Sequence, residues 1–155
     1  IIFCKPEYAK FVDKAVFPGN SGGPHMNTIA AKAIAGEEAL TDEYRNYIHQ
    51  VVKNAKAMSN EFIKMGYEII SGGTDNHMFL LSLAAANCSG AQLQEKLEEE
   101  AHIILNKNMI PGDKRKPKET SGVRIGTAAM TTKGYTEDDF IDVAHTIDHY
   151  IKSFN

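Results

Sequence analysis

The chain has 155 residues, enough for one ordinary domain with a core, or for one domain and part of another. Its apolar fraction of 43%, charged fraction of 24% and net charge of -3 are those of a globular protein and give no reason to expect nucleic acid or membrane as a partner. Its two cysteines, Cys4 and Cys88, form neither a disulfide framework nor a zinc spacing. Both lie in apolar stretches, which favours buried, reduced thiols and a cytoplasmic location.

The first 40 residues predict a leading piece of strand and two helices. Ile1 to Cys4 resembles a buried strand entered midway, and with no initiator methionine before it we expect a truncated protein. A short helix is predicted over 7–16, and the sequence FPGNSGGP that follows is a dense turn segment. An Ala-rich helix is predicted from His25 to about Leu40, with Pro24 in its first turn.

A long helix is predicted to begin after Thr41 and to end at Gly66. Apolar residues recur there at alternating spacings of four and three, which is the pattern of one buried helical face. The residues of this face are Tyr44, Ile48, Val51, Ala55, Met58, Phe62 and Met65.

Short strands and single helices alternate through the rest of the chain. The predicted strands are 67–71, 78–83, 102–105 and 122–127, with a loop over 106–120. Ser89 is expected to cap a helix that runs to about Ala101, and Thr136 to cap the last helix with Asp139 in a capping box. This order predicts an α+β fold, an α/β sandwich in which helices pack on a small, largely antiparallel sheet.

Gly19-Asn20-Ser21-Gly22-Gly23-Pro24 precedes a predicted helix. Consecutive glycines expose backbone N–H groups, and a helix N-terminus adds a favourable dipole, so this segment could cradle a phosphate. A plain tight turn explains the same residues.

Ser121-Gly122-Val123-Arg124-Ile125-Gly126-Thr127 places an arginine inside an otherwise apolar strand. Arginine is rarely buried without a partner, and its planar fork suits two-point contact with a carboxylate. The pattern leaves two readings open for Arg124: a ligand carboxylate, or an internal salt bridge.

Two further polar segments have a structural and a functional interpretation. Gly72-Gly73-Thr74-Asp75-Asn76-His77 could be a metal or acid–base site, but a hairpin whose Asp and Asn bond their own backbone is favoured. The run Lys114-Arg115-Lys116-Pro117-Lys118 is either a solvated loop or a contact for a polyanion. No histidine pair has the spacing of a metal site, and we predict none.

Five strings in order resemble the serine hydroxymethyltransferase family, in its bacterial form, over the whole chain. They are AVFPG with GGP (15–24), VKNAKAM (52–58), ISGGTDNH (70–77), NKN (106–108), and TSGVRIGT (120–127) followed by TTKG (131–134). Ser21 and Ala128 stand where the family often has Gln and Pro, and Lys116 and Lys118 where some bacterial members have Ser and Phe.

The resemblance implies the C-terminal part of a fold-type I pyridoxal-phosphate enzyme, a homodimer that exchanges a one-carbon unit between serine and tetrahydrofolate. Residues 1–40 would end the large, cofactor-binding domain and 41–155 would form the small domain. The cofactor lysine would lie upstream of Ile1, so no catalytic residue is expected in this chain, which would be inactive alone.

Carried over residue by residue, the resemblance makes Arg124 the ligand of the serine or glycine carboxylate. Gly22 and Gly23 would offer N–H groups to the pyridoxal phosphate of the partner subunit. Asn108 would contact the folate, with Lys116, Pro117 and Lys118 in the same region. The alternative function is a stand-alone, non-catalytic module that binds a small anion.

Overall fold

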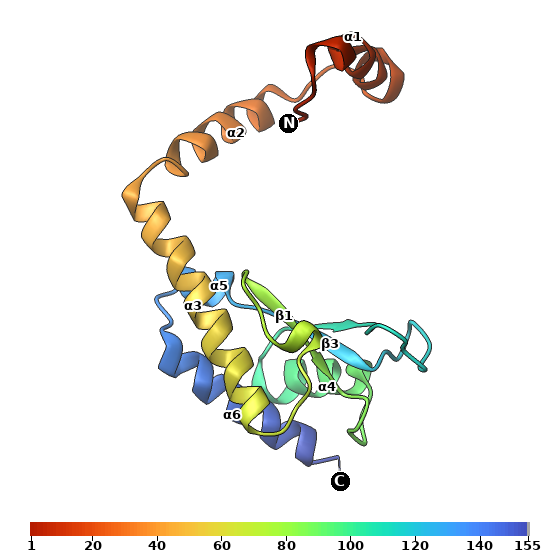
Figure 1. Ribbon diagram of the computed structural model, residues 1–155, viewed down its shortest axis with the longest axis vertical. Coiled ribbons are helices and arrows are strands. Elements are labelled where there is room, and N and C mark those ends of the chain that lie inside the picture. Colours follow the sequence, from red (N-terminus) through yellow and green to blue (C-terminus); the bar gives the residue numbers. More distant parts are fainter. Residues whose placement is uncertain (155) are drawn as a thin grey trace. The chain divides into compact units, whose positions relative to one another are not determined.

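The computed structural model describes residues 1–154, and the chain divides into two compact units, Ile1–Asp42 and Glu43–Asn155 (Figure 1). Within the described residues, no helix is both long enough and apolar enough to cross a membrane.

The first unit holds two helices and no strand. Helix α1 (Pro6–Lys14) starts with proline in its first turn and leads into a wide helical turn, η1 (Ala15–Asn20), and helix α2 spans Met26–Glu38. The predicted strand at Ile1–Cys4 is wrong, since these residues pair with no other strand in the described chain. Pro24 lies before α2 and not in its first turn, because the helix begins two residues later.

No side chain of the first unit, all of which is described, is buried. Phe3 is 91% exposed, Phe11 74% and Leu40 81%. Cys4 is exposed as well, so the prediction of a buried thiol there is wrong. The physical reason is size: about 40 residues in two helices cannot enclose a core of their own.

The second unit opens with the long helix that the sequence predicts. Helix α3 spans Asp42–Lys64 and buries Val51, Ala55, Met58 and Phe62 from the predicted face, while Tyr44 near its start is 40% exposed. Gly66 follows with a φ of 91°, a left-handed conformation that ends helices and favours glycine.

A three-stranded antiparallel sheet has the order β1-β3-β2, with β1 at Met78–Ser82, β2 at Asn106–Asn108 and β3 at Gly122–Gly126. The strands predicted at 78–83 and 122–127 are therefore confirmed. The strand predicted at 67–71 is wrong: Ile69 forms one bridge with Leu81, and the chain then turns through η2 (Ile70–Gly72).

The strand predicted at 102–105 is also wrong. His102 adopts a left-handed conformation with a φ of 55° as it ends the preceding helix, which delays the strand to Asn106. The first three residues of the loop predicted over 106–120 therefore form strand β2. Pattern alone misses such a strand, because all three of its residues, Asn106, Lys107 and Asn108, are polar.

Helix α4 (Gly90–Lys96) continues through a wider turn, η3 (Leu97–Ala101), and helix α6 spans Glu137–Lys152. Thr136 forms the expected capping box with Asp139, and Ser89, expected only to cap its helix, forms a capping box as well, with Gln92. A short helix between them and after β3, α5 (Ala128–Thr132), is not predicted by the sequence.

Three helices cover one face of the sheet, as Figure 1 shows for α3, α4 and α6. Alternate strand residues point to that face and enter a single core with the helices. The strand residues concerned are Phe79, Leu81, Val123 and Ile125. Burying a side chain of this size contributes roughly 1.5–3 kcal/mol. The predicted α+β fold, helices on a small antiparallel sheet, is confirmed.

Candidate functional site

Arg124 lies at the centre of β3, the middle strand, and points to the face of the sheet that the helices do not cover. Its neighbours in register are Leu80 on β1 and Asn106 on β2. The side chain is exposed, and Arg124 Nη2 donates a hydrogen bond to Asn106 Oδ1 at 3.1 Å. The expectation of a buried arginine is therefore wrong, because alternation along the strand puts this position opposite the core.

The internal salt bridge considered for Arg124 is wrong too. Among residues 1–154, no carboxylate lies within salt-bridge distance of its guanidinium. The positive charge is thus open to a ligand from outside the described chain.

Glycines stand on both sides of Arg124 on this face of β3. Gly122 and Gly126 stand two residues away along the strand, on the same face. A Cβ at Gly122 would lie 3.1 Å from both the Asn108 and Leu81 carbonyl oxygens, closer than side chains normally come. The same Cβ would lie 2.5 Å from Ile110 Cγ2, so the Ile110 side chain covers β3 at Gly122. At Gly126, which is exposed, a Cβ would come no closer than 3.8 Å to a neighbour, so the face beside Arg124 is open at that end of the strand.

The C-terminal end of β3 is fixed to the long helix. Thr127 Oγ1 donates to Val51 O at 2.9 Å, and Thr127 is fully buried. Thr131 Oγ1 in turn donates to Thr127 O at 2.8 Å. These buried hydrogen bonds fix the position of the end of β3 along helix α3.

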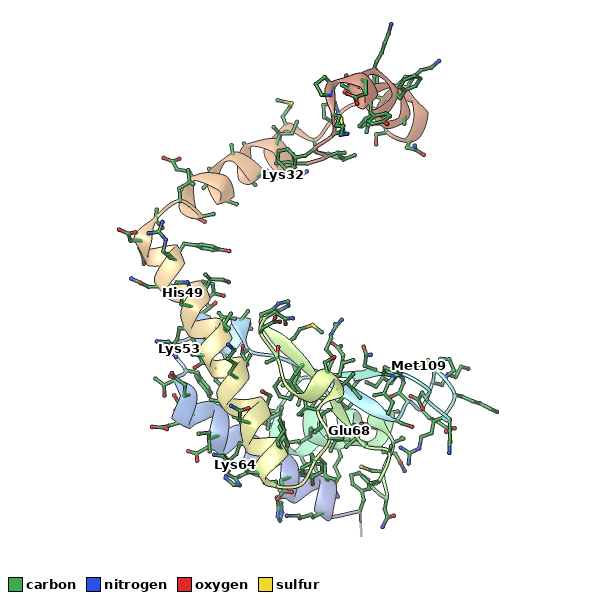
Figure 2. The ribbon with its side chains drawn as sticks, viewed as in Figure 1. Lys32, His49, Lys53, Lys64, Glu68 and Met109 are labelled. Carbon is green, nitrogen blue, oxygen red and sulfur yellow. The ribbon has the colours of Figure 1, made fainter. Side chains whose placement is uncertain are left out.

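Asn108 shares the open face with Arg124, because it is two residues from Asn106 on β2 and pairs with Gly122. It is half-buried, and its Nδ2 donates to Met109 O at 2.7 Å. Met109, labelled in Figure 2, begins the loop that connects β2 to β3. Register in the sheet thus brings together two of the predicted site residues.

The basic loop after β2 is organised around Asp113, a residue that sequence reasoning missed. Its carboxylate accepts from the backbone N–H of Ser121 at 2.8 Å, of Arg115 at 2.9 Å and of Ile110 at 3.3 Å. Hydrogen bonds from Ser121 and then from the other two outweigh partial burial and lower the pKa of Asp113 to about 2. The Gly112-Asp113 turn pair was the available signal.

Arg115 has a structural part within the same loop. Its Nη1 donates to Cys88 O at 2.7 Å, which ties the loop to the segment before α4. Lys116, Pro117 and Lys118 are exposed, and neither lysine is paired with a carboxylate in the described chain. With Lys114, which is also exposed, the loop presents three lysines from a backbone that Asp113 and Arg115 anchor.

Gly22 and Gly23 lie in the first unit, between η1 and α2, in a hollow of about 820 Å³ that Lys32 of α2 also lines (Figure 2). A Cβ at either glycine would meet nothing within 4 Å, and neither has a left-handed φ. No described backbone acceptor binds their N–H groups. Nothing in this unit therefore requires glycine at either position.

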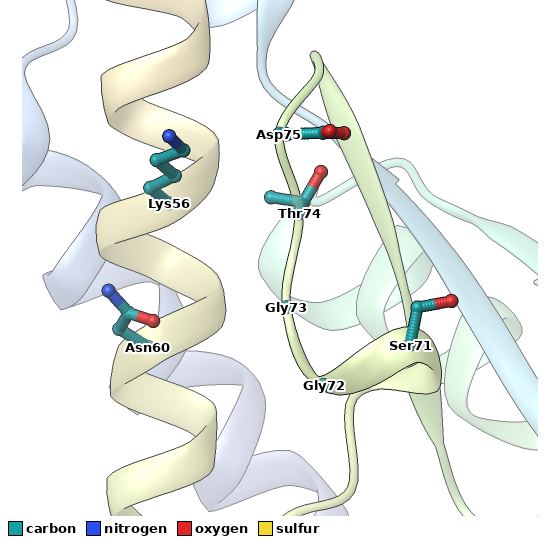
Figure 3. A pocket seen from close by; sticks show the side chains of 7 residues that line it. All are labelled: Lys56, Asn60, Ser71, Gly72, Gly73, Thr74 and Asp75. Carbon is teal, nitrogen blue, oxygen red and sulfur yellow. The ribbon is translucent and has the colours of Figure 1, made fainter.

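A separate hollow of about 470 Å³ lies between α3 and the turn before β1 (Figure 3). Lys56 and Asn60, on adjacent turns of α3, line it from the helix, and the Asp75 side chain points away from the helix. None of the predicted site residues lines it. The predicted hydrogen bonding of this segment to its own backbone is present at Asn76, whose Oδ1 accepts from Met78 N at 3.0 Å. The other local bonds are made by the Thr74 hydroxyl and not, as predicted, by Asp75. No metal-binding cluster of three His, Cys, Asp or Glu occurs within 1–154.

The fold is that of an α+β domain whose sheet keeps one face open and presents an arginine on it. The sequence model of the serine hydroxymethyltransferase family matches residues 4–147. The chain belongs to the serine hydroxymethyltransferase family. Its members are pyridoxal-phosphate-dependent transferases of one-carbon metabolism that act with a folate substrate.

Proposed function

We propose that this chain is part of an active serine hydroxymethyltransferase, interconverting serine and tetrahydrofolate with glycine and 5,10-methylenetetrahydrofolate, and that it supplies the site for the substrate carboxylate. The observation that carries this proposal is the exposed, unpaired guanidinium of Arg124 on the open face of the sheet. A planar fork with unused N–H groups binds a carboxylate by two parallel hydrogen bonds. Binding at that point fixes the amino acid for reaction.

Gly22 and Gly23 would hold the phosphate of pyridoxal phosphate in the partner subunit of a homodimer. Their unbonded N–H groups, their lack of Cβ atoms and Lys32 in the same hollow suit a phosphate group. The cofactor, when bound, supplies the electron sink for bond breaking at the α-carbon of the amino acid. Residues 1–40 would complete the large domain, and their exposed apolar side chains would be covered there.

The folate would bind beside Arg124. Asn108 offers an amide on the same face, and Lys116 and Lys118, with Pro117 between them, would attract the negative charges of a glutamyl tail. Replacing both lysines by alanine should raise the KM for polyglutamylated folate more than for the monoglutamate, and most at low salt. Equal effects on both folates would remove the lysines from this role.

The main test replaces Arg124 in the holoenzyme. Arg124→Ala should raise the KM for serine on the order of a hundredfold, and Arg124→Lys should restore part of the loss, since one point charge replaces a two-point contact. Lys107→Ala, an exposed cation on β2, is the matched control and should leave the KM unchanged. An unchanged KM for serine in Arg124→Ala would overturn the proposal.

A second test separates the cofactor contact from folding. Gly22→Ala and Gly23→Ala meet no neighbour and no strained φ, so the melting temperature of the apoprotein should not change. The dissociation constant for pyridoxal phosphate should rise roughly tenfold, because the added methyl group would displace the phosphate. Unaltered cofactor affinity would exclude both glycines. Calorimetry of the chain alone with serine and folate tests the alternative of a stand-alone anion-binding module, for which binding should persist.

A further inference from the structure

Arg124 pairs directly with two residues in the sheet, and the polar one of the two lies on β2. On β1, the residue that pairs with Arg124 is Leu80, whose side chain cannot accept a hydrogen bond. On β2 it is Asn106, whose Oδ1 accepts from Arg124 Nη2 at 3.1 Å. Gly122 and Gly126 offer no side chain along β3. Within the described residues, the hydrogen bond to Asn106 is thus the polar contact that holds the guanidinium.

The chemistry of this contact suits a residue that orients Arg124 without neutralising it. An aspartate in place of Asn106 would form an ion pair and would compete with a ligand carboxylate for the same fork. The amide oxygen accepts one hydrogen bond and leaves the full positive charge available. Counted over residues 1–154, four of the five guanidinium N–H donors remain unused.

Asn106 itself is held by the sheet. It opens β2 in register with Arg124, and the next residue, Lys107, donates its backbone N–H to Gln94 Oε1 of α4 at 2.8 Å. The strand is thus pinned on both sides, to β3 and to α4. A side chain on such a strand has a defined direction, as a loop residue would not.

We propose that Asn106 is a positioning residue for substrate binding: it holds one arm of the Arg124 guanidinium, so that the remaining N–H groups meet the carboxylate of the amino acid as a fixed fork. The proposal rests on the function proposed for Arg124. It adds a residue that contacts the arginine and not the reacting atoms.

The test compares Asn106→Ala and Asn106→Asp in the holoenzyme. Asn106→Ala frees the arginine to move, and should raise the KM for serine and the dissociation constant for glycine roughly tenfold, with a smaller change in kcat. Aspartate is nearly the same size as asparagine but forms an ion pair with the arginine. Asn106→Asp should therefore raise both the KM for serine and the dissociation constant for glycine by on the order of a hundredfold. Calorimetric titration with glycine gives a readout that does not depend on turnover.

A double-mutant cycle excludes a merely structural role. In an Arg124→Ala background, neither Asn106 substitution should weaken glycine binding further, because the residue acts through the arginine. Lys107→Ala, the adjacent position on β2, is the control, and melting temperatures of all variants check folding.

The outcomes separate this inference from the function on which it rests. If Arg124→Ala weakens serine binding but the Asn106 variants do not, the positioning role is overturned and the proposed function stands. Additive losses in the double variants overturn it as well, since Asn106 would then act independently of Arg124. If Arg124→Ala has no effect on serine binding, both proposals fail together.

Discussion

Asn54 and Thr131 meet in the interior of the second unit, where Asn54 Nδ2 donates a hydrogen bond to Thr131 Oγ1 at 2.9 Å. Asn54 is fully buried, and its Nδ2 also donates to Tyr135 O at 2.9 Å while its Oδ1 accepts from Gln50 Nε2 at 2.8 Å. The long helix α3 is thereby joined to the segment that follows the strand carrying Arg124.

Asn54→Leu should lower the free energy of unfolding by about 3 kcal/mol. The substitution leaves the Tyr135 carbonyl without its buried donor, which costs about 1–3 kcal/mol, and removes the hydrogen bond to Thr131, worth about 0.5–1.5 kcal/mol, although the Thr131 hydroxyl still donates to Thr127 O. Urea denaturation measures the change. Asn60→Leu, on the same helix but exposed and without a described hydrogen bond, is the control and should change stability by less than about 0.5 kcal/mol. Equal losses in the two variants would contradict the role of Asn54.

Gly90→Ala should destabilise the second unit strongly. A Cβ at Gly90 would collide with Thr120 Oγ1 and with the Gly122 carbonyl oxygen, because the start of α4 packs directly on the turn before β3. Overpacking of this kind typically costs about 1–3 kcal/mol. Thermal unfolding is the measurement, with Gly126→Ala as control, since a Cβ there would approach its neighbours no closer than 3.8 Å. If the melting temperature of Gly90→Ala is no lower than that of the control, the turn before β3 can move to accept the methyl group without a loss of stability, and the prediction is wrong.

Asp113 should make the loop between β2 and β3 sensitive to acid. Its pKa is about 2 in the folded chain against an ordinary value of 3.8. Because the folded value is the lower one, the carboxylate stabilises the fold above about pH 4, and this contribution is lost as the pH falls towards about 2. Asp113→Asn should be less stable near neutral pH and should lose less stability over that acid range.

Urea midpoints across the acid range compare Asp113→Asn with the parent chain. Asp75→Asn, an exposed carboxylate without a described hydrogen bond, controls for net charge. A parallel fall of the parent chain and Asp113→Asn would show that Asp113 contributes nothing to the acid sensitivity.

The two cysteines should differ sharply in reactivity. Cys4 is exposed in the chain, whereas Cys88 is 1% exposed and burial raises the pKa of its thiol. Iodoacetamide near neutral pH should therefore modify Cys4 rapidly and Cys88 only as the core opens. Mass spectrometry of the peptides gives both rates. Urea should equalise them, and comparable rates without urea would mean that the core is not closed around Cys88.

The sequence by itself determined the main helices and the family. Two local signals predict the helices: the alternating spacing of apolar residues from Val51 to Phe62, and the capping residues Ser89 and Thr136. Both depend on interactions within one helix, namely an amphipathic face and hydrogen bonds at the first turn. The string around Arg124 also identified a strand with an unusual residue at its centre. These features depend on residues close together in the chain.

Only the tertiary structure decided which face of the sheet Arg124 occupies and what stands beside it. Strand β2 is short and polar, so its existence depends on pairing with β3 and not on its own propensity. That pairing makes Asn106 the neighbour of Arg124 and puts Asn108 on the same face. Contacts between residues far apart in sequence depend on strand register, which the local pattern around Arg124 does not contain.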